Sequence, residues 1–157
     1  MSDLPSRVIP MSYMGVPFSH DPSGSRAAIL GIPFDCGTHP TRIGARRGPD
    51  AIRMQSSLVR PYYPPDFDFN PLELLNLVDC GNVACVAGEV ESALRMIETA
   101  VSEICQTGAV PVTMGGDGLV SLPQLRALSK MHNDLVFIHI DAHTDTYPSS
   151  GSQTNDL

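Results

Sequence analysis

Three side chains that could hold a metal ion lie close together late in the sequence. Asp141, His143 and Asp145 alternate with small residues, directly after an apolar run. Extended backbone points side chains at i, i+2 and i+4 in the same direction, so the three can face one site. Carboxylate oxygens and an imidazole nitrogen suit Mn²⁺ or another divalent first-row ion better than a metal that prefers thiolates. A carboxylate could bridge two such ions, which would lower the pKa of a shared water. A polar turn with helix-capping aspartates is the alternative interpretation.

A glycine-rich turn is the second feature that could do chemistry. Residues 114–118 read Met-Gly-Gly-Asp-Gly, between an apolar run and a helical pattern. One interpretation is a tight turn in which the glycines allow positive φ. Another is a dinucleotide-binding motif, Gly116-x-Gly118-x-x-Ser121, with Asp141 as the ribose-binding acid. Serine at the third glycine position argues against that motif, and the motif would leave two of the three candidate metal ligands without a role.

Apolar runs and amphipathic patterns predict the elements that position both features. Strands are expected at residues 26–33, 74–79, 109–114 and 135–140, and helices at 50–58, 89–106 and 121–131. An arm is expected at 1–25, a long loop at 34–48 and irregular structure at 61–71. Alternating strands and helices predict a parallel sheet covered on both faces. Ligands bind such sheets at the carboxyl ends of the strands, which is where both features fall.

The composition narrows the class of protein. With 157 residues, 42% hydrophobic and 17% charged, the chain is expected to form one domain with a real core rather than a disordered region. The net charge of −7 argues against duplex nucleic acid as a partner. No apolar run is long enough to cross a bilayer, and the first residues lack a signal-peptide pattern. A cytoplasmic protein without a membrane partner is expected.

The cysteines and a group of arginines have plain interpretations. The cysteines form no C-x-x-C pair, so we expect small buried hydrophobic residues rather than zinc ligands or disulfides. They are Cys36, Cys80, Cys85 and Cys105. Five arginines lie close together in the sequence, and we expect a solvated loop-and-helix face, with an anion site as the alternative. They are Arg42, Arg46, Arg47, Arg53 and Arg60.

Four motifs together resemble those of a known family. They are GIPFD at 31–35, GARRGPDAIR at 44–53, MGGDG followed by Leu-Pro at 114–123, and IDAHTDTY at 140–147. Their order and spacing resemble the ureohydrolases, the group of arginases, agmatinases and guanidinobutyrases, and within it the agmatinase-like branch. Histone deacetylase-like proteins share the fold but not this set of motifs.

The resemblance implies a three-layer α/β/α domain with a mainly parallel sheet and two Mn²⁺ ions. A hydroxide shared by the ions would attack the guanidinium carbon of a small cationic guanidino substrate and release urea and an amine. Asp141 would bridge both ions, while His143 and Asp145 would each bind one, and Asp117 would orient a ligand by a hydrogen bond. The resemblance also implies a homo-oligomer, either a trimer or a hexamer. It leaves agmatine, guanidinobutyrate, guanidinopropionate and arginine open as substrates.

Two departures from the family pattern affect these expectations. Gly118 stands where the family has a histidine ligand, so one ion should bind more weakly, and neither His132 nor His139 is expected to replace it. Later strands of the family carry an Asp-x-Asp motif with further ligands, and the sequence contains only three of the six expected ligands. We therefore expect residues 26–157 to be the N-terminal portion of a single ureohydrolase domain, incomplete for catalysis. The alternative is a non-catalytic relative that acts as an interaction or regulatory protein.

Overall fold

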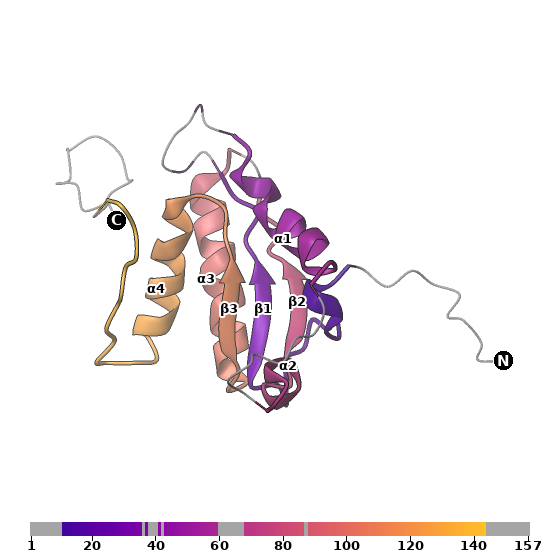
Figure 1. Cartoon of the computed structure of the whole chain (residues 1–157). Helices are drawn as coiled ribbons and strands as arrows, with labels where there is room; N and C mark the ends of the chain where they lie inside the picture. Colours follow the sequence, from indigo (N-terminus) through magenta and orange to yellow (C-terminus); the bar gives the residue numbers. More distant parts are fainter. Residues whose placement is uncertain are drawn as a thin grey trace.

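A parallel sheet runs through the middle of the structure, a computed structural model that describes residues 11–35, 37, 41, 43–59, 68–86 and 88–143 (Figure 1). In the described part its strands are β1 (Ala27–Gly31), β2 (Val78–Asn82) and β3 (Val110–Met114), in the order β2-β1-β3. β1 lies in the centre and pairs with both neighbours in parallel. The predicted parallel sheet is confirmed for these strands.

Helices cover the sheet. They are α1 (Gly48–Ser56), α2 (Pro71–Leu74), α3 (Val90–Gln106) and α4 (Ser121–Ser129), with short 3₁₀ turns η1 (Tyr13–Gly15), η2 (Ala45–Arg47) and η3 (Gly118–Val120). α3 buries Leu94, Ile97 and Val101 on one face, as its helical spacing predicts. In the ranges that the structure describes, no helix has the length and apolar character that a bilayer crossing requires.

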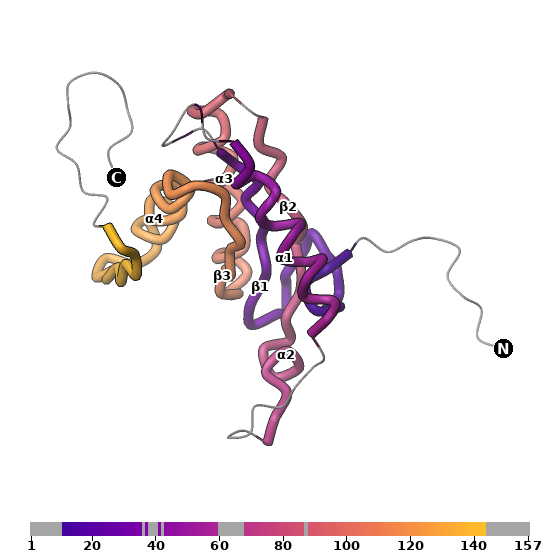
Figure 2. Tube along the Cα trace, turned by 45° about the horizontal axis from the view of Figure 1, so that its top comes forward, coloured from indigo at the N-terminus to yellow at the C-terminus, as the bar shows by residue number. Residues whose placement is uncertain are grey.

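The strands alternate their side chains between two apolar layers. Ala28 and Leu30 of β1 belong to the larger core, which α3 and α4 cover. Ala27 and Ile29 point to the opposite face, where Val16 from the N-terminal segment covers them. Figure 2 shows the tube of the chain turned so that both sides of the sheet can be followed. This period of two places helices and loops on both faces of the sheet, as expected for an α/β/α arrangement.

The predicted second strand is shifted along the chain. A strand was expected at 74–79, but α2 occupies Pro71–Leu74 and β2 begins at Val78. Asn70 explains the difference, because its side-chain oxygen accepts the backbone N–H of Leu72 at 3.0 Å and caps the helix. Proline in the first turn also favours a helix start.

The predicted fourth strand is wrong. Residues 135–140 form no strand, and Val136, Ile138 and Ile140 are 81%, 78% and 94% exposed. The segment lies on the side of α4 away from β3 (Figures 1 and 2). Apolar composition favours a strand only where a neighbouring strand can supply hydrogen bonds, and the described part of the chain places none beside this segment.

A buried ion pair joins α1 to β2. The carboxylate of Asp79 is fully buried and accepts hydrogen bonds from Nε and Nη2 of Arg53, both at 2.8 Å. It also accepts the backbone N–H groups of Tyr13 at 2.8 Å and Gly81 at 2.9 Å. One carboxylate therefore holds a helix, the N-terminal segment and the end of a strand together.

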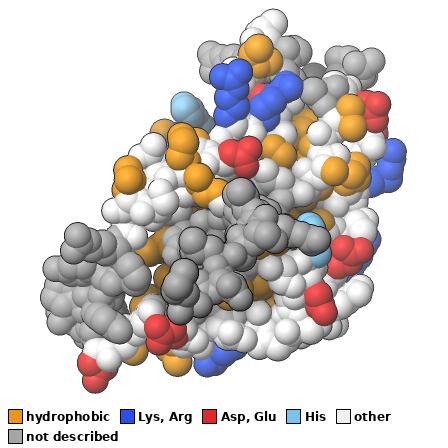
Figure 3. Space-filling view, turned by 90° about the vertical axis from the view of Figure 1, so that its right-hand side faces the viewer, with side chains coloured by type: hydrophobic (Ala, Val, Ile, Leu, Met, Phe, Trp, Pro, Cys, Tyr) orange, Lys and Arg blue, Asp and Glu red, His pale blue; other side chains and the backbone are white. Residues whose placement is uncertain are grey.

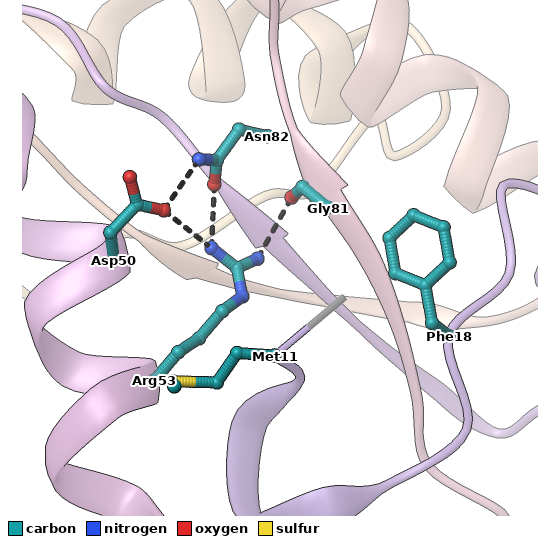
Figure 4. Close-up of a pocket in the computed structure, with 6 residues that line it drawn as sticks. All are labelled: Met11, Phe18, Asp50, Arg53, Gly81 and Asn82. Carbon is teal, nitrogen blue, oxygen red and sulfur yellow. Dashed lines mark hydrogen bonds and ion pairs between the residues drawn. The ribbon is translucent and has the colours of Figure 1, made fainter. Parts of the chain in front are cut away.

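The other side of the Arg53 guanidinium faces a small cavity of about 300 Å³ (Figure 4). Nη1 donates to Asn82 Oδ1 at 2.6 Å, and Nη2 donates to the carbonyl oxygen of Gly81 at 2.9 Å. Asp50 lies 3.7 Å from Nη1 on the solvent side. The N–H groups of the Arg53 guanidinium are thus hydrogen-bonded to other residues of the fold. The residues around this cavity therefore have a structural role.

Burial alone would raise the pKa of Asp79, but hydrogen bonds from Arg53 and from two backbone N–H groups outweigh it and hold the pKa below its ordinary value of 3.8. A carboxyl group with a lowered pKa in the folded state stabilises the fold above its unfolded-state pKa. That contribution is lost as the pH falls through the folded-state value.

Asp79→Asn is expected to lower the free energy of unfolding at pH 7 by about 3 kcal/mol, because it leaves the buried guanidinium without its counter-charge. Urea denaturation followed by circular dichroism measures the change. The wild type should lose stability more steeply than the variant between about pH 5 and pH 2. Asp134→Asn removes an exposed carboxylate and should stay within about 0.5 kcal/mol of the wild type. Equal stability of the two variants would contradict the role given to Asp79.

Candidate functional site

Two of the sequence motifs meet at the carboxyl end of the sheet. The backbone N–H of Ile32 donates to the carbonyl oxygen of Met114 at 2.8 Å, and that of Asp117 donates to Phe34 at 3.1 Å. The N–H of Gly37 then donates to Asp117 Oδ2 at 2.8 Å. The loop after β1 and the turn after β3 are therefore tied to each other by both backbone and side-chain hydrogen bonds.

Gly116 permits this approach because it has no side chain. A Cβ at this position would lie 1.7 Å from the carbonyl oxygen of Phe34, far inside contact distance. The expected reason for the glycines in this turn was positive φ, and that reason is wrong. Gly115, Gly116 and Gly118 are not among the glycines with positive φ. Close packing of two backbones explains Gly116 instead.

A second buried carboxylate organises the loop after β1. Asp35 Oδ2 accepts the backbone N–H groups of Gly44 at 2.7 Å and Arg46 at 3.3 Å. Its Oδ1 accepts Nε of Arg46 at 2.8 Å and is ion-paired with the same guanidinium. Asp35 thus closes the loop that leads to the motif GARRGPDAIR at 44–53. Gly48 of this motif begins α1 and lies beside the carbonyl oxygen of Gly115.

Two of the three arginines that the structure describes in this group differ from the expected solvated face. Arg53 is buried and Arg46 is half-buried against a carboxylate, whereas Arg47 is exposed. Arg42 and Arg60 lie outside the described residues. Figure 3 shows basic side chains gathered at the end of the molecule toward which the strands point.

Asp117 connects two loops in the described part of the chain, and its expected role of orienting a metal ligand stays a prediction. Its Oδ1 accepts the backbone N–H of Leu119 at 3.2 Å and so caps η3, while Oδ2 holds Gly37. Gly118 is the first residue of η3 and has no positive φ. A side chain at position 118 would therefore meet no backbone strain, and glycine is not needed there for conformation.

Asp141 and His143 lie together on the surface. The backbone N–H of His143 donates to Asp141 Oδ1 at 2.8 Å, and Nδ1 of its ring lies 3.5 Å from the same oxygen. The hydrogen bond from His143 lowers the pKa of the Asp141 carboxyl, so it stays ionised. Asp145 lies outside the described residues. Within the described ranges no three histidine, cysteine or acidic side chains are placed to share an ion.

Other expected features have clear outcomes. His139, which was not expected to replace the missing histidine ligand, is exposed, with Nε2 3.2 Å from the carbonyl oxygen of His143. The dinucleotide interpretation needs a strand before Asp141, and residues 135–140 form none. Cys80 is buried, and Cys85 and Cys105 pack against the core as expected, while Cys36 lies outside the described residues.

Comparison with known proteins gives the same family as the motifs. The sequence pattern of the Arginase family matches residues 25–156. A guanidinobutyrase of Pseudomonas aeruginosa is 40% identical over 119 residues, which are 76% of this chain and 37% of that protein.

Solved structures show the same likeness. The proclavaminate amidino hydrolase of Streptomyces clavuligerus has a TM-score of 0.81 and 32% identity, covering 90% of this chain and 46% of that one. A formiminoglutamase of Trypanosoma cruzi, solved with Mn²⁺, has a TM-score of 0.71 and 27% identity, covering 84% and 45% of the two chains. The chain thus spans less than half the length of the proteins it matches.

The close approach at Gly116 leads to a prediction about stability. Gly116→Ala is expected to lower the free energy of unfolding by about 3 kcal/mol or more, because the new Cβ must displace the backbone of the loop after β1. Gly115→Ala is the matched control, since its Cβ would lie 3.2 Å from a methyl group of Val120, which need shift by only a few tenths of an ångström, and should cost about 1 kcal/mol. Urea denaturation measures both. Similar costs for the two variants would show that the loops are not held together at Gly116.

Proposed function

The chain belongs to the arginase family, and on that premise we propose that it forms part of a binuclear manganese ureohydrolase. The reaction is the hydrolysis of a small cationic guanidino compound to urea and an amine. The same resemblance supports a cytoplasmic homo-oligomer, a trimer or hexamer, with neither nucleic acid nor a membrane as partner.

One observation supports this proposal above the others. The motifs GIPFD and MGGDG, about 80 residues apart, contact each other at the carboxyl ends of β1 and β3, where the backbone N–H of Asp117 donates to the carbonyl oxygen of Phe34 at 3.1 Å. Parallel sheets bind their ligands at that end. A tight, costly contact between two loops is expected where the loops border a site, and less so at an ordinary turn.

The metal ligands proposed are Asp141, His143 and Asp145. Their oxygen and nitrogen donors fit Mn²⁺, and the backbone N–H of His143 donates to the Asp141 carboxylate at 2.8 Å. The formiminoglutamase relative was solved with that ion. When bound, manganese supplies Lewis acidity and lowers the pKa of a water molecule. The chain's own part is to hold the ion with these side chains and to shape the border of the site with the loops after β1 and β3.

The second candidate function is a non-catalytic relative that serves as an interaction or regulatory subunit. Gly118 favours it, because the resemblance places a histidine ligand there and no positive φ requires glycine at this position. Catalysis with this chain would need further ligands from elsewhere, since the sequence supplies three of the six that the resemblance calls for. Manganese binding separates the two candidates.

The isolated chain is expected to bind Mn²⁺ weakly through the proposed ligands. Asp141→Ala should weaken binding at least about 10-fold, because losing even outer contacts of a metal site costs 10- to 100-fold. Electron paramagnetic resonance of free Mn²⁺ measures the affinity. Asp134→Ala is the control and should bind as the wild type does. Unchanged binding by Asp141→Ala would show that the metal site is misassigned.

Gly118→His is expected to strengthen Mn²⁺ binding, because it restores a neutral nitrogen donor at a position without a positive φ. We expect an increase in affinity of at least about 10-fold, by the same scale of ligand effects. Gly118→Ala adds a Cβ without a donor and should leave the affinity unchanged. The same gain in both variants, or in neither, would mean that position 118 does not face the ion.

A further inference from the structure

The outer face of α3 carries a row of three exposed side chains. Arg95, Thr99 and Glu103 follow one another at intervals of four residues, so they line up along one side of the helix. The opposite side of α3 packs on the core, where Ile97 and Val101 are buried. α3 lies beside α4 in both views of the chain (Figures 1 and 2). We refer to the three exposed residues as the α3 row.

A hollow lies on each side of the α3 row, and the residues of the row line both. The first hollow has a volume of about 330 Å³, and its other lining residues are Val83, Ala84, Met96 and Ala100. The second has a volume of about 440 Å³, and its other lining residues are Glu98, Ser102, Gln106 and Lys130. Helices pack against each other by fitting rows of side chains beside such depressions, so this face has the shape that receives another helix.

The two ends of the α3 row carry opposite charges that no ion pair in the described part of the chain uses. Arg95 and Glu103 take part in none of the salt bridges there. Glu98, in contrast, is ion-paired with Lys130 at the end of α4. Arg95 lies four residues before Thr99 and Glu103 four residues after it. At a rise of 1.5 Å per residue, each charge stands about 6 Å along the helix from Thr99.

This spacing makes the α3 row complementary to itself. When two α3 helices run antiparallel about a twofold axis at Thr99, Arg95 of one copy faces Glu103 of the partner subunit, and the same pair forms a second time. Ser92 and Gln106 lie seven residues on either side of Thr99 and follow the same symmetry. A parallel arrangement would set like charges against each other. Thr99 has a short side chain, which lets the two helices approach at the axis.

We propose that the α3 row binds the α3 row of a second copy of this chain, antiparallel and about a twofold axis at Thr99. The two hollows beside the row receive side chains of the partner helix. This interface specifies one contact of the homo-oligomer proposed above and rests on that part of the proposed function, not on hydrolysis or metal binding. A dimer or a hexamer with twofold axes contains such a contact, whereas a cyclic trimer has no twofold axis.

Other occupants fit this face less well. α3 carries three acidic residues, Glu91, Glu98 and Glu103, against the single base Arg95, and helices that bind anionic membranes are basic. An unrelated protein partner would require no symmetry in the α3 row. Opposite charges at equal distances from one small residue are what a twofold contact requires, and they favour a second copy.

Charge reversal tests the interface. The wild type should form a reversible dimer, or a larger assembly of dimers, in sedimentation velocity at micromolar concentration. Arg95→Glu and Glu103→Arg each create two like-charge contacts per dimer, so each should raise the dissociation constant at least about 10-fold. Both positions are exposed, so the unfolding midpoint followed by circular dichroism should stay that of the wild type.

Mixing the two single variants is the sharper test. Arg95→Glu has two acidic residues in the α3 row and Glu103→Arg has two basic ones, so every contact between the two chains joins opposite charges. An equal mixture should therefore associate as the wild type does, although each variant alone does not. Arg47→Glu makes the same change of charge at an exposed position in η2, and it should associate as the wild type does.

Each outcome decides for or against the proposal. A monomeric wild type overturns it, and cosedimentation of that monomer with phosphatidylserine vesicles would assign the row to a membrane contact. Equal association of all variants would place the contact between copies elsewhere, and a mixture without rescue would mean that Arg95 and Glu103 do not face each other. Mn²⁺ binding is scored separately. A rescued dimer that binds no Mn²⁺ would refute the metal site and leave the interface standing.

Discussion

The need to satisfy carboxylates at the ends of parallel strands determines most of this structure. Asp79 lies in β2, Asp35 follows β1 and Asp117 follows β3. Asp79 and Asp117 each accept a backbone N–H group from a segment distant in the sequence, and Asp35 accepts two from the loop that follows it. A buried carboxylate without partners costs several kcal/mol, so the loops must close on it. No buried side-chain oxygen or nitrogen in the described ranges lacks a hydrogen bond. Loop positions at the carboxyl end of the sheet follow from these three residues.

Sequence patterns correctly predicted the helices and strands whose own residues determine which face is buried. The 3.6-residue spacing of α3 and the short apolar runs of β1 and β3 were read correctly, because those residues themselves show which face is buried. Segment 135–140 has the same composition as a strand, but a strand also requires a neighbour, and no local pattern reports one. The shift of β2 has a local cause, since Asn70 and Pro71 start a helical turn that apolar composition had concealed.

The sequence predicted which loops belong to the candidate site, but it did not predict the contacts between those loops. The motifs identified the turn after β3 and the loop after β1, but not that Gly116 lets the two backbones touch. A glycine is compatible with positive φ and with close packing, and only the neighbouring backbone distinguishes them. The burial of Arg53 was missed for a similar reason. Charge alone predicts a side chain in solvent, whereas the buried carboxylate of Asp79 binds the Arg53 guanidinium inside the fold.

The turn after β3 and the candidate metal ligands Asp141 and His143 are connected by a short stretch of chain. α4 begins just after the Asp117 turn and leads into segment 135–140, which ends at Asp141. The turn is fixed to β1 by hydrogen bonds, whereas the segment has no strand partner among the described residues. The position of Asp141 and His143 relative to the turn therefore depends on what pairs with that segment.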